Sequence, residues 1–225
     1  MRYLLHFLIS NHGATTLRHT GRWFMKLLGL SFSPRKQGNT ELLLEKVFIG
    51  AGQSGAQTEL YRVADRDIKP CDGCGSCFKT GDCHIQDDMQ DLYERMLEAD
   101  GIVFGTPVYF YNMTAQGKTV IDRTIALGHP GKSLANKVGG IVVVGGSLGL
   151  IDAVKDLYFY MVTRQMLPAN FVAAYAGGEG DVNKLQKCMK AAEELGSQMV
   201  KIAEKKFTYP EEFKATHIAY GTHTW

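Results

Sequence analysis

The sequence predicts an α/β fold, in which helices cover both faces of a doubly wound parallel sheet of five strands. Two observations carry this prediction. From Met25 onward, short apolar runs rich in β-formers alternate with longer segments of helical periodicity. Several of the short runs are almost continuously apolar, which is typical of strands that are buried on both faces.

The expected elements alternate along the chain. Strands are expected at residues 26–31, 58–63, 101–105, 138–145 and 170–175, and helices at 40–54, 87–99, 115–125, 150–166 and 182–206. Apolar residues of the last helix recur at spacings of three and four, as on the buried face of an amphipathic helix. This alternation favours the flavodoxin-like strand order 2-1-3-4-5, which binds its ligand beyond the carboxyl ends of the strands.

Length and composition are typical of one globular domain. The 225 residues are 45% apolar and 21% charged, with a net charge of +2 and no long run of one sign. That balance argues against a nucleic-acid or membrane-surface role. The apolar run near the N-terminus lacks a cleavage pattern and is too short to span a bilayer, so we expect a cytoplasmic protein. We assign 25–206 to the domain, 1–24 to an extension outside the fold and 207–225 to a tail.

A loop suited to an anion follows the first expected strand. Between Ser31 and Thr40 it holds hydroxyl groups, a proline, two basic residues and a glycine, and it leads into a helix. Donors then converge on the positive end of a helix dipole. The loop matches neither the dinucleotide nor the nucleoside-triphosphate glycine pattern, which favours a phosphomonoester such as that of FMN. An ordinary turn capped by Asn39 or Thr40 is the alternative.

A second loop, at residues 105–114, follows the third expected strand and lies at the same edge of the sheet. Its three consecutive aromatic residues, Tyr109 to Tyr111, are too apolar for an exposed turn but suit a planar heteroaromatic ring. The small residues Gly146 and Ser147, after the fourth strand, allow close approach of a ligand to the backbone. Packing in the core or at a dimer interface is the alternative interpretation of the aromatic run.

Four of the five cysteines lie within thirteen positions, at Cys71, Cys74, Cys77 and Cys83. The spacing C-x2-C-x2-C-x5-C is compact and continuous, as at the start of ferredoxin motifs, and Cys83 would complete one [4Fe-4S] centre. Zinc, or a dithiol redox pair, is the alternative. We expect His84 to be an exposed loop residue. Asp87 and the residue after it are expected to begin a helix, where negative charge is favourable.

Together these segments resemble the iron-sulfur flavoproteins, the cluster-containing branch of the NADPH-dependent FMN reductase-like proteins. The resemblance covers about residues 25–206, and the cysteine motif is its most specific element. It implies a flavodoxin-like fold, FMN, one [4Fe-4S] cluster held by the four cysteines, and a homodimer or homotetramer in which cluster and flavin of neighbouring subunits approach each other. Cofactor contacts are expected at Ser31, Ser33, Arg35, Gly38, Asn39, Thr40, Thr106, Pro107, Val108, Tyr109, Phe110, Asn112, Met113, Gly146 and Ser147.

The function expected from this set is that of an oxidoreductase carrying electrons between FMN and the cluster. A donor such as ferredoxin would supply them, and oxygen, peroxide, a quinone or a protein would accept them. No catalytic side chain is required by this scheme. Two alternatives are an NAD(P)H-dependent FMN or quinone reductase and a zinc-stabilised ligand-binding module.

Overall fold

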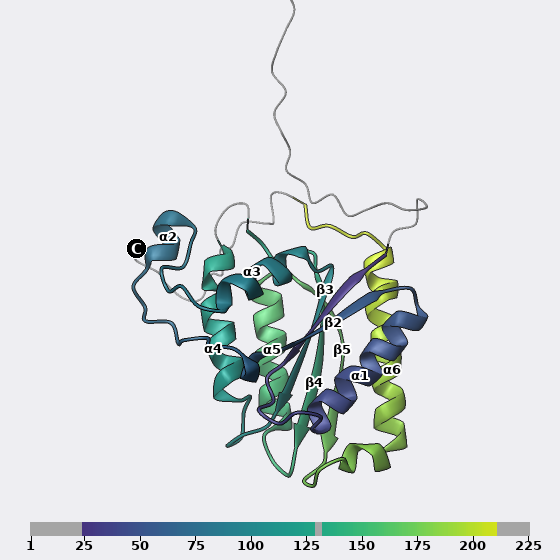
Figure 1. The fold of residues 1–225 in the computed structure, drawn as a ribbon. Helices are drawn as coiled ribbons and strands as arrows, with labels where there is room; N and C mark the ends of the chain where they lie inside the picture. The colour runs from purple at the N-terminus through teal and green to yellow at the C-terminus, as the bar shows by residue number, and fades with distance from the viewer. Residues whose placement is uncertain (1–23, 129–131, 211–225) are drawn as a thin grey trace, which may run out of the picture.

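A computed structural model describes residues 24–128 and 132–210 of the chain (Figure 1). Five parallel strands form one sheet in the order β2-β1-β3-β4-β5, which confirms the predicted fold class. Residues 1–23 of the expected extension and 211–225 of the expected tail lie outside the described residues. The strands are β1 (Lys26–Ser31), β2 (Gln57–Arg62), β3 (Gly101–Pro107), β4 (Val138–Gly145) and β5 (Leu167–Tyr175).

Helices cover both faces of the sheet. Figure 1 shows α1 and α6 together on one side and α3, α4 and α5 on the other, each layer closing its own apolar core. None of the helices in the described part of the chain is long and apolar enough to cross a membrane. The helices are α1 (Asn39–Gln53), α2 (Ser76–Thr80), α3 (Met89–Glu98), α4 (Ala115–Arg123), α5 (Leu150–Thr163) and α6 (Gln186–Glu204), with 3-10 turns η1 (Val63–Asp65), η2 (Thr124–Gly128) and η3 (Asp181–Lys184).

The central strands have the burial that their composition predicts. Every residue of β4 is buried, as is every residue of β3 except its last, whereas the first half of β2, at the edge, is exposed. A strand covered by helices on both sides needs apolar side chains on both faces, which explains the continuous apolar runs.

Several element boundaries differ from the predictions by one to four residues, and one α-helix was not predicted. The last helix begins at Gln186 instead of residue 182, because Gly180 adopts a left-handed φ of 70° and a 3-10 turn precedes the helix. Strand β5 begins at Leu167 and includes Pro168, which an edge strand tolerates. The short helix α2 inside the cysteine segment was not predicted.

Two glycines allow α1 and α6 to pack backbone against backbone. A Cβ atom built on Gly50 would lie 1.8 Å from the carbonyl oxygen of Glu193, and one on Gly196 would lie 1.9 Å from that of Val47. Ser197 Oγ donates a hydrogen bond to the carbonyl oxygen of Gly50 across the same contact, at 3.0 Å. Neither clash could be relieved by a side-chain rotation, because both partners are backbone atoms.

Gly196→Ala should therefore destabilise the fold, by about 1–3 kcal/mol or more, because the two helices must move apart. Gly52→Ala is the matched control, since a Cβ on Gly52 meets nothing within 4 Å. It should be neutral or stabilising by up to about 1 kcal/mol through helix propensity. Urea unfolding of both variants measures the difference, and equal stability of Gly196→Ala and the parent would contradict this account of the contact.

Candidate functional site

A cavity of about 470 Å³ opens at the carboxyl ends of the strands. This volume lies within the range of small-molecule and cofactor sites. The loops after four different strands border it, as expected for a doubly wound sheet. The lining residues are Ser33, Arg35, Lys36, Gly38, Asn39, Thr40, Pro107, Val108, Tyr109, Val144, Gly145, Gly146, Ala176, Gly177 and Glu179.

The buried carboxylate of Glu41 shapes the loop between β1 and α1. Its Oε1 accepts a hydrogen bond from Ser31 Oγ at 3.0 Å, and its Oε2 accepts one from the Gln37 amide at 2.8 Å. The guanidinium of Arg62, from the end of β2, forms an ion pair with the same carboxylate. The loop is thereby folded back against the start of α1, with Glu41 at the third helical position, where such reciprocal contacts are common.

The first turn of α1 faces the cavity with free donors. Gly38 is the N-cap and has no side chain to cap the helix, so the first amide groups stay available for a ligand. Among the described residues, the exposed Arg35 guanidinium and the Thr40 hydroxyl have no hydrogen-bond partner. The Asn39 side chain is engaged elsewhere: its Nδ2 donates to the Gly178 carbonyl at 2.7 Å, which ties this loop to the one after β5.

The aromatic loop makes a tight turn. Backbone hydrogen bonds join Tyr109 and Asn112 in both directions, and between them Phe110 and Tyr111 have left-handed φ angles of 46° and 72°. Bulky residues rarely adopt this conformation, which is costly in a side-chain-bearing residue and concentrates at functional sites. The turn leaves Phe110 96% exposed, with Tyr109 at the cavity.

The structure brings nine of the fifteen predicted cofactor contacts to the cavity wall and places six outside it. Ser31 and Thr106 are fully buried behind the wall, and Phe110 and Ser147 are exposed beside it. Asn112 Nδ2 donates to Asp156 at 2.6 Å, while Met113 borders another cavity. The nine that line it are Ser33, Arg35, Gly38, Asn39, Thr40, Pro107, Val108, Tyr109 and Gly146.

Six lining residues were not among the predicted contacts. One signal could have found the three that follow β5: this strand is parallel to β4, so its carboxyl end must lie at the same edge. The six are Lys36, Val144, Gly145, Ala176, Gly177 and Glu179.

The four clustered cysteines border one small second cavity, of about 20 Å³. Cys77 is carried by α2, and the others lie in the loop segments around it. Gly73, Gly75 and Gly81 have φ angles of 72°, 69° and 79°, so glycine is required at the turns between the thiols. Burial raises the pKa of the Cys77 thiol, and the neighbouring Cys83 adds to the shift.

His84 and Asp72 stand at the rim of the cysteine cavity. His84 is about half exposed, as predicted, and its Nε2 lies 2.7 Å from Asp72 Oδ2. Asp72 also accepts the Cys74 amide at 3.1 Å, and this backbone hydrogen bond is the main reason that the pKa of Asp72 is lowered. Asp72, Cys74 and His84 form a loose trio of potential ligand atoms within 4.8 Å of one another, all on exposed residues.

A buried ion pair closes the base of the cysteine loop. Arg123, at the end of α4, makes two hydrogen bonds to Asp87, of 2.8 and 3.0 Å, and both side chains are completely buried. Its Nη atoms also donate to the carbonyl oxygens of Lys69 and Ile85, at 2.7 and 3.2 Å. One guanidinium thus holds both ends of the loop.

Asp87 does more than begin a helix, which was the role predicted for it. Helix α3 begins two residues later, and Asp87 Oδ1 does accept the Met89 amide at 3.0 Å. Burial acts to raise the pKa of Asp87, but hydrogen bonds from Arg123 and from the Lys69 and Met89 amides outweigh burial and lower the pKa. The sequence carried no signal for this pairing, because the two partners are 36 positions apart.

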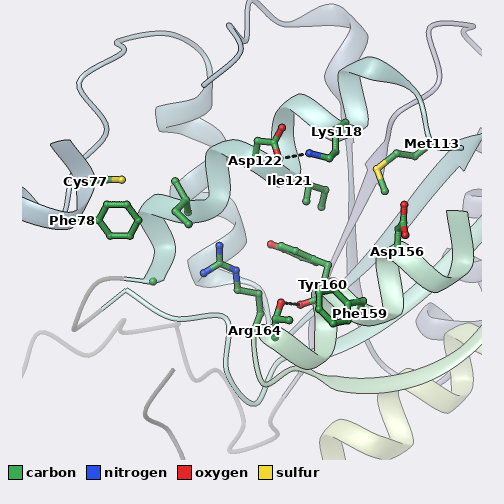
Figure 2. A pocket seen from close by; sticks show the side chains of 13 residues that line it. Cys77, Phe78, Met113, Lys118, Ile121, Asp122, Asp156, Phe159, Tyr160 and Arg164 are labelled. Carbon is green, nitrogen blue, oxygen red and sulfur yellow. Dashed lines mark hydrogen bonds and ion pairs between the residues drawn. The ribbon is translucent and has the colours of Figure 1, made fainter. Parts of the chain in front are cut away.

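An apolar groove of about 700 Å³ runs beside α4 and α5 (Figure 2). At one end are Cys77 and Phe78 of α2, and at the other are Met113 and Asp156, next to the aromatic loop. Figure 2 shows Phe159 and Tyr160 contributed by α5 and Ile121 by α4. Phe78 is 72% exposed and Phe159 53%, so the described chain leaves large aromatic surface uncovered here.

Both cavities have features that fit redox cofactors. At the carboxyl edge, Cβ atoms built on Gly146 and Gly177 would meet no protein atom within 4 Å, so these glycines leave room for a ligand. Free amide, hydroxyl and guanidinium donors on one wall suit a phosphate, and the apolar Pro107 and Val108 suit a ring. In the cysteine loop, four thiols around one cavity are the donor set of an iron-sulfur or zinc centre.

Residues 25–180 match the family model described as NADPH-dependent FMN reductase. An iron-sulfur flavoprotein of Methanocaldococcus jannaschii is 35% identical over 190 residues, which are 80% of this chain and 98% of the relative. The chain belongs to the iron-sulfur flavoprotein family. A second iron-sulfur flavoprotein, from Methanosarcina thermophila, is 33% identical over 76% of this chain and 93% of its own length.

Solved structures of flavoproteins share the fold. The structure of RosB with a bound riboflavin-5'-phosphate derivative aligns with a TM-score of 0.66 at 19% identity, over 86% of this chain and 82% of that one. An NAD(P)H:quinone oxidoreductase from Methanothermobacter marburgensis aligns with a TM-score of 0.62 at 13% identity, over 78% and 96%. As an iron-sulfur flavoprotein, the chain is a flavin redox protein and an oxidoreductase, with FMN as the cofactor its family supports.

Gly146→Val tests the cavity as the FMN site. The new side chain would enter space that no protein atom occupies, so it should leave the stability of the apoprotein within about 0.5 kcal/mol of the parent. It should weaken the binding of FMN at least ten-fold, about 1.4 kcal/mol, because the valine side chain would occupy space that the cofactor needs. Gly52→Val, far from the cavity, is the control. Fluorescence titration of the apoproteins with FMN measures the affinity of both variants. Unchanged FMN affinity in Gly146→Val would remove this cavity as the site.

Proposed function

We propose that this iron-sulfur flavoprotein carries electrons between FMN at the carboxyl edge and a [4Fe-4S] cluster held by Cys71, Cys74, Cys77 and Cys83. A low-potential protein such as ferredoxin is the proposed donor, and oxygen, peroxide, a quinone or another protein is the proposed acceptor. The observation that carries the proposal is the convergence of all four clustered cysteines on one cavity, in a chain with a separate cavity suited to a flavin.

The proposed FMN contacts come from this chain's own loops. The first turn of α1, with the Thr40 hydroxyl and the Arg35 guanidinium, would hold the phosphate. Pro107, Val108 and Tyr109 would contact the ring, with Gly146 giving the backbone close access. Bound FMN supplies two-electron chemistry and a [4Fe-4S] centre one-electron chemistry, so together they can divide electron pairs.

The two cavities are far apart within one chain, which supports an assembly of subunits. The cavity at the carboxyl edge and the cysteine cavity share no lining residue among the described residues. Figure 1 places α2 near the upper end of the molecule, whereas α1 begins near the lower end, where the strands finish. A direct path between a flavin and a cluster on the same chain would have to cross that length. A neighbouring subunit can bring its own flavin or cluster closer.

We place a second copy of this chain on the apolar groove. The groove joins Cys77 of the cysteine loop to Asp156 beside the aromatic loop, so one partner seated there would touch both regions. Exposed aromatic and aliphatic residues along it, Phe78, Phe159 and Ile125 among them, resemble the core of a subunit interface more than an open surface.

The proposed cluster is tested by anaerobic purification with iron and sulfide analysis, and by absorption spectra before and after dithionite. We expect about four irons and four sulfides per chain. Cys77→Ser should lose most of the iron and keep FMN, because the cysteine loop and the FMN cavity are separate. Cys188→Ser is the matched control, since Cys188 lies in α6 away from the loop, and should keep both.

The other outcomes of this experiment identify the alternatives. Fewer than about two irons per chain, with FMN bound, would overturn the relay and leave an NAD(P)H-dependent FMN or quinone reductase. A colourless protein with stoichiometric zinc would indicate a zinc-stabilised binding module. Loss of FMN together with iron in Cys77→Ser would contradict the independence of the two sites.

Phe159→Glu tests the proposed contact between copies. A carboxylate in the groove should shift the assembly to smaller species, with at least a ten-fold weaker self-association, about 1.4 kcal/mol. Ile49→Glu is the control, because Ile49 is similarly exposed but lies on α1 in the other helical layer. Sedimentation velocity over a concentration series measures both. A parent that is monomeric at every concentration would rule out the proposed assembly.

A further inference from the structure

We propose that Arg123 is a positioning residue for the iron-sulfur centre: its guanidinium is a fixed positive charge beside the cluster, and its Nε–H donates a hydrogen bond to a sulfur atom there. The proposal rests on the proposed function, because it requires a cluster in the cysteine cavity. It adds a role for a residue outside the cysteine motif, 40 positions after its last ligand.

The hydrogen bonds of the guanidinium fix its place. Arg123 has a completely buried side chain, and its two Nη atoms donate four hydrogen bonds. Their acceptors are both oxygens of Asp87 and the carbonyls of Lys69 and Ile85. These hydrogen bonds fix the orientation of the guanidinium, so the same atoms of Arg123 always face the cysteine cavity.

The remaining donor has no acceptor. Arg123 Nε is buried and has no hydrogen-bond partner among the residues that the structure describes. Leaving a buried donor unsatisfied costs about 1–3 kcal/mol, and more for a charged group, so native structures rarely keep one without a purpose. Arg123 borders the same cavity as Cys71, Cys74, Cys77 and Cys83.

Arg123 stays positively charged although it is buried. Burial works against the cation, but the hydrogen bonds to Asp87 outweigh it and raise the pKa of Arg123, and a negative charge on Cys83 acts in the same direction. Asp87 balances one unit of charge, so the pair by itself is neutral and can be buried. Four thiolates add negative charge that only a metal centre and nearby donors can offset.

The chemical consequence is a change in reduction potential. Reduction adds one electron to the cluster, and a nearby cation and N–H donor stabilise the more negative state. Removing the donor therefore makes the cluster harder to reduce. This effect acts on the cluster alone and leaves the FMN cavity, which Arg123 does not line, unchanged.

The first test is Arg123→Lys in the full chain with its cofactors. Lysine keeps a positive charge opposite Asp87 but has no Nε–H, so iron, sulfide and FMN contents should match the parent. At the parent's cluster midpoint, the ratio of reduced to oxidised cluster should fall about ten-fold, which is about 59 mV for a one-electron couple. Arg95→Lys is the control, because Arg95 is paired on α3 and does not border the cysteine cavity.

The second test uses the parent sequence and keeps the proposal decidable if Arg123→Lys loses its cluster. Protein labelled with nitrogen-15 only at the arginine Nε is reduced, and hyperfine spectroscopy of the paramagnetic cluster is recorded. A nitrogen-15 coupling that persists in Arg95→Lys supports the proposal. A cluster with no such coupling, or an unchanged potential in Arg123→Lys, overturns it. Absence of any cluster would instead overturn the proposed function.

Discussion

The ion pair of Arg123 and Asp87 is the constraint on which the cysteine loop depends. Helix α2 inside that loop has no buried residue, so the loop cannot hold its position through a core of its own. The guanidinium instead fastens the carbonyls of Lys69 and Ile85, one at each end. Because removal of one partner from a buried pair leaves an uncompensated charge, this contact is also where the loop is most vulnerable.

A second buried ion pair orders the loop between β1 and α1 in the same way. Glu41, 3% exposed, receives Arg62 from the end of β2 and folds the loop between β1 and α1 onto its helix. In both places a buried carboxylate at or near a helix start meets an arginine from a neighbouring element. The pair orders a polar loop that would otherwise have little reason to adopt one conformation.

Much of this architecture could be predicted from the sequence, because its signals are local. Continuous apolar runs mark β3 and β4, and the cysteine spacing marks its loop. The predictions missed what depends on distant partners. The Asn39 side chain lines the cavity and also binds the Gly178 carbonyl 139 positions away, and Asp87 meets Arg123 inside the protein. Neither pairing leaves a trace in the spacing of nearby residues.

The way the cysteine loop is attached bears on how such proteins arise. Both of its ends meet at one guanidinium, so they lie close together in space although fifteen residues separate Lys69 from Ile85. A segment whose ends are neighbours can be inserted or deleted without altering the register of the sheet beneath it. Gain or loss of the cysteine segment would then leave the rest of the domain and its sheet intact.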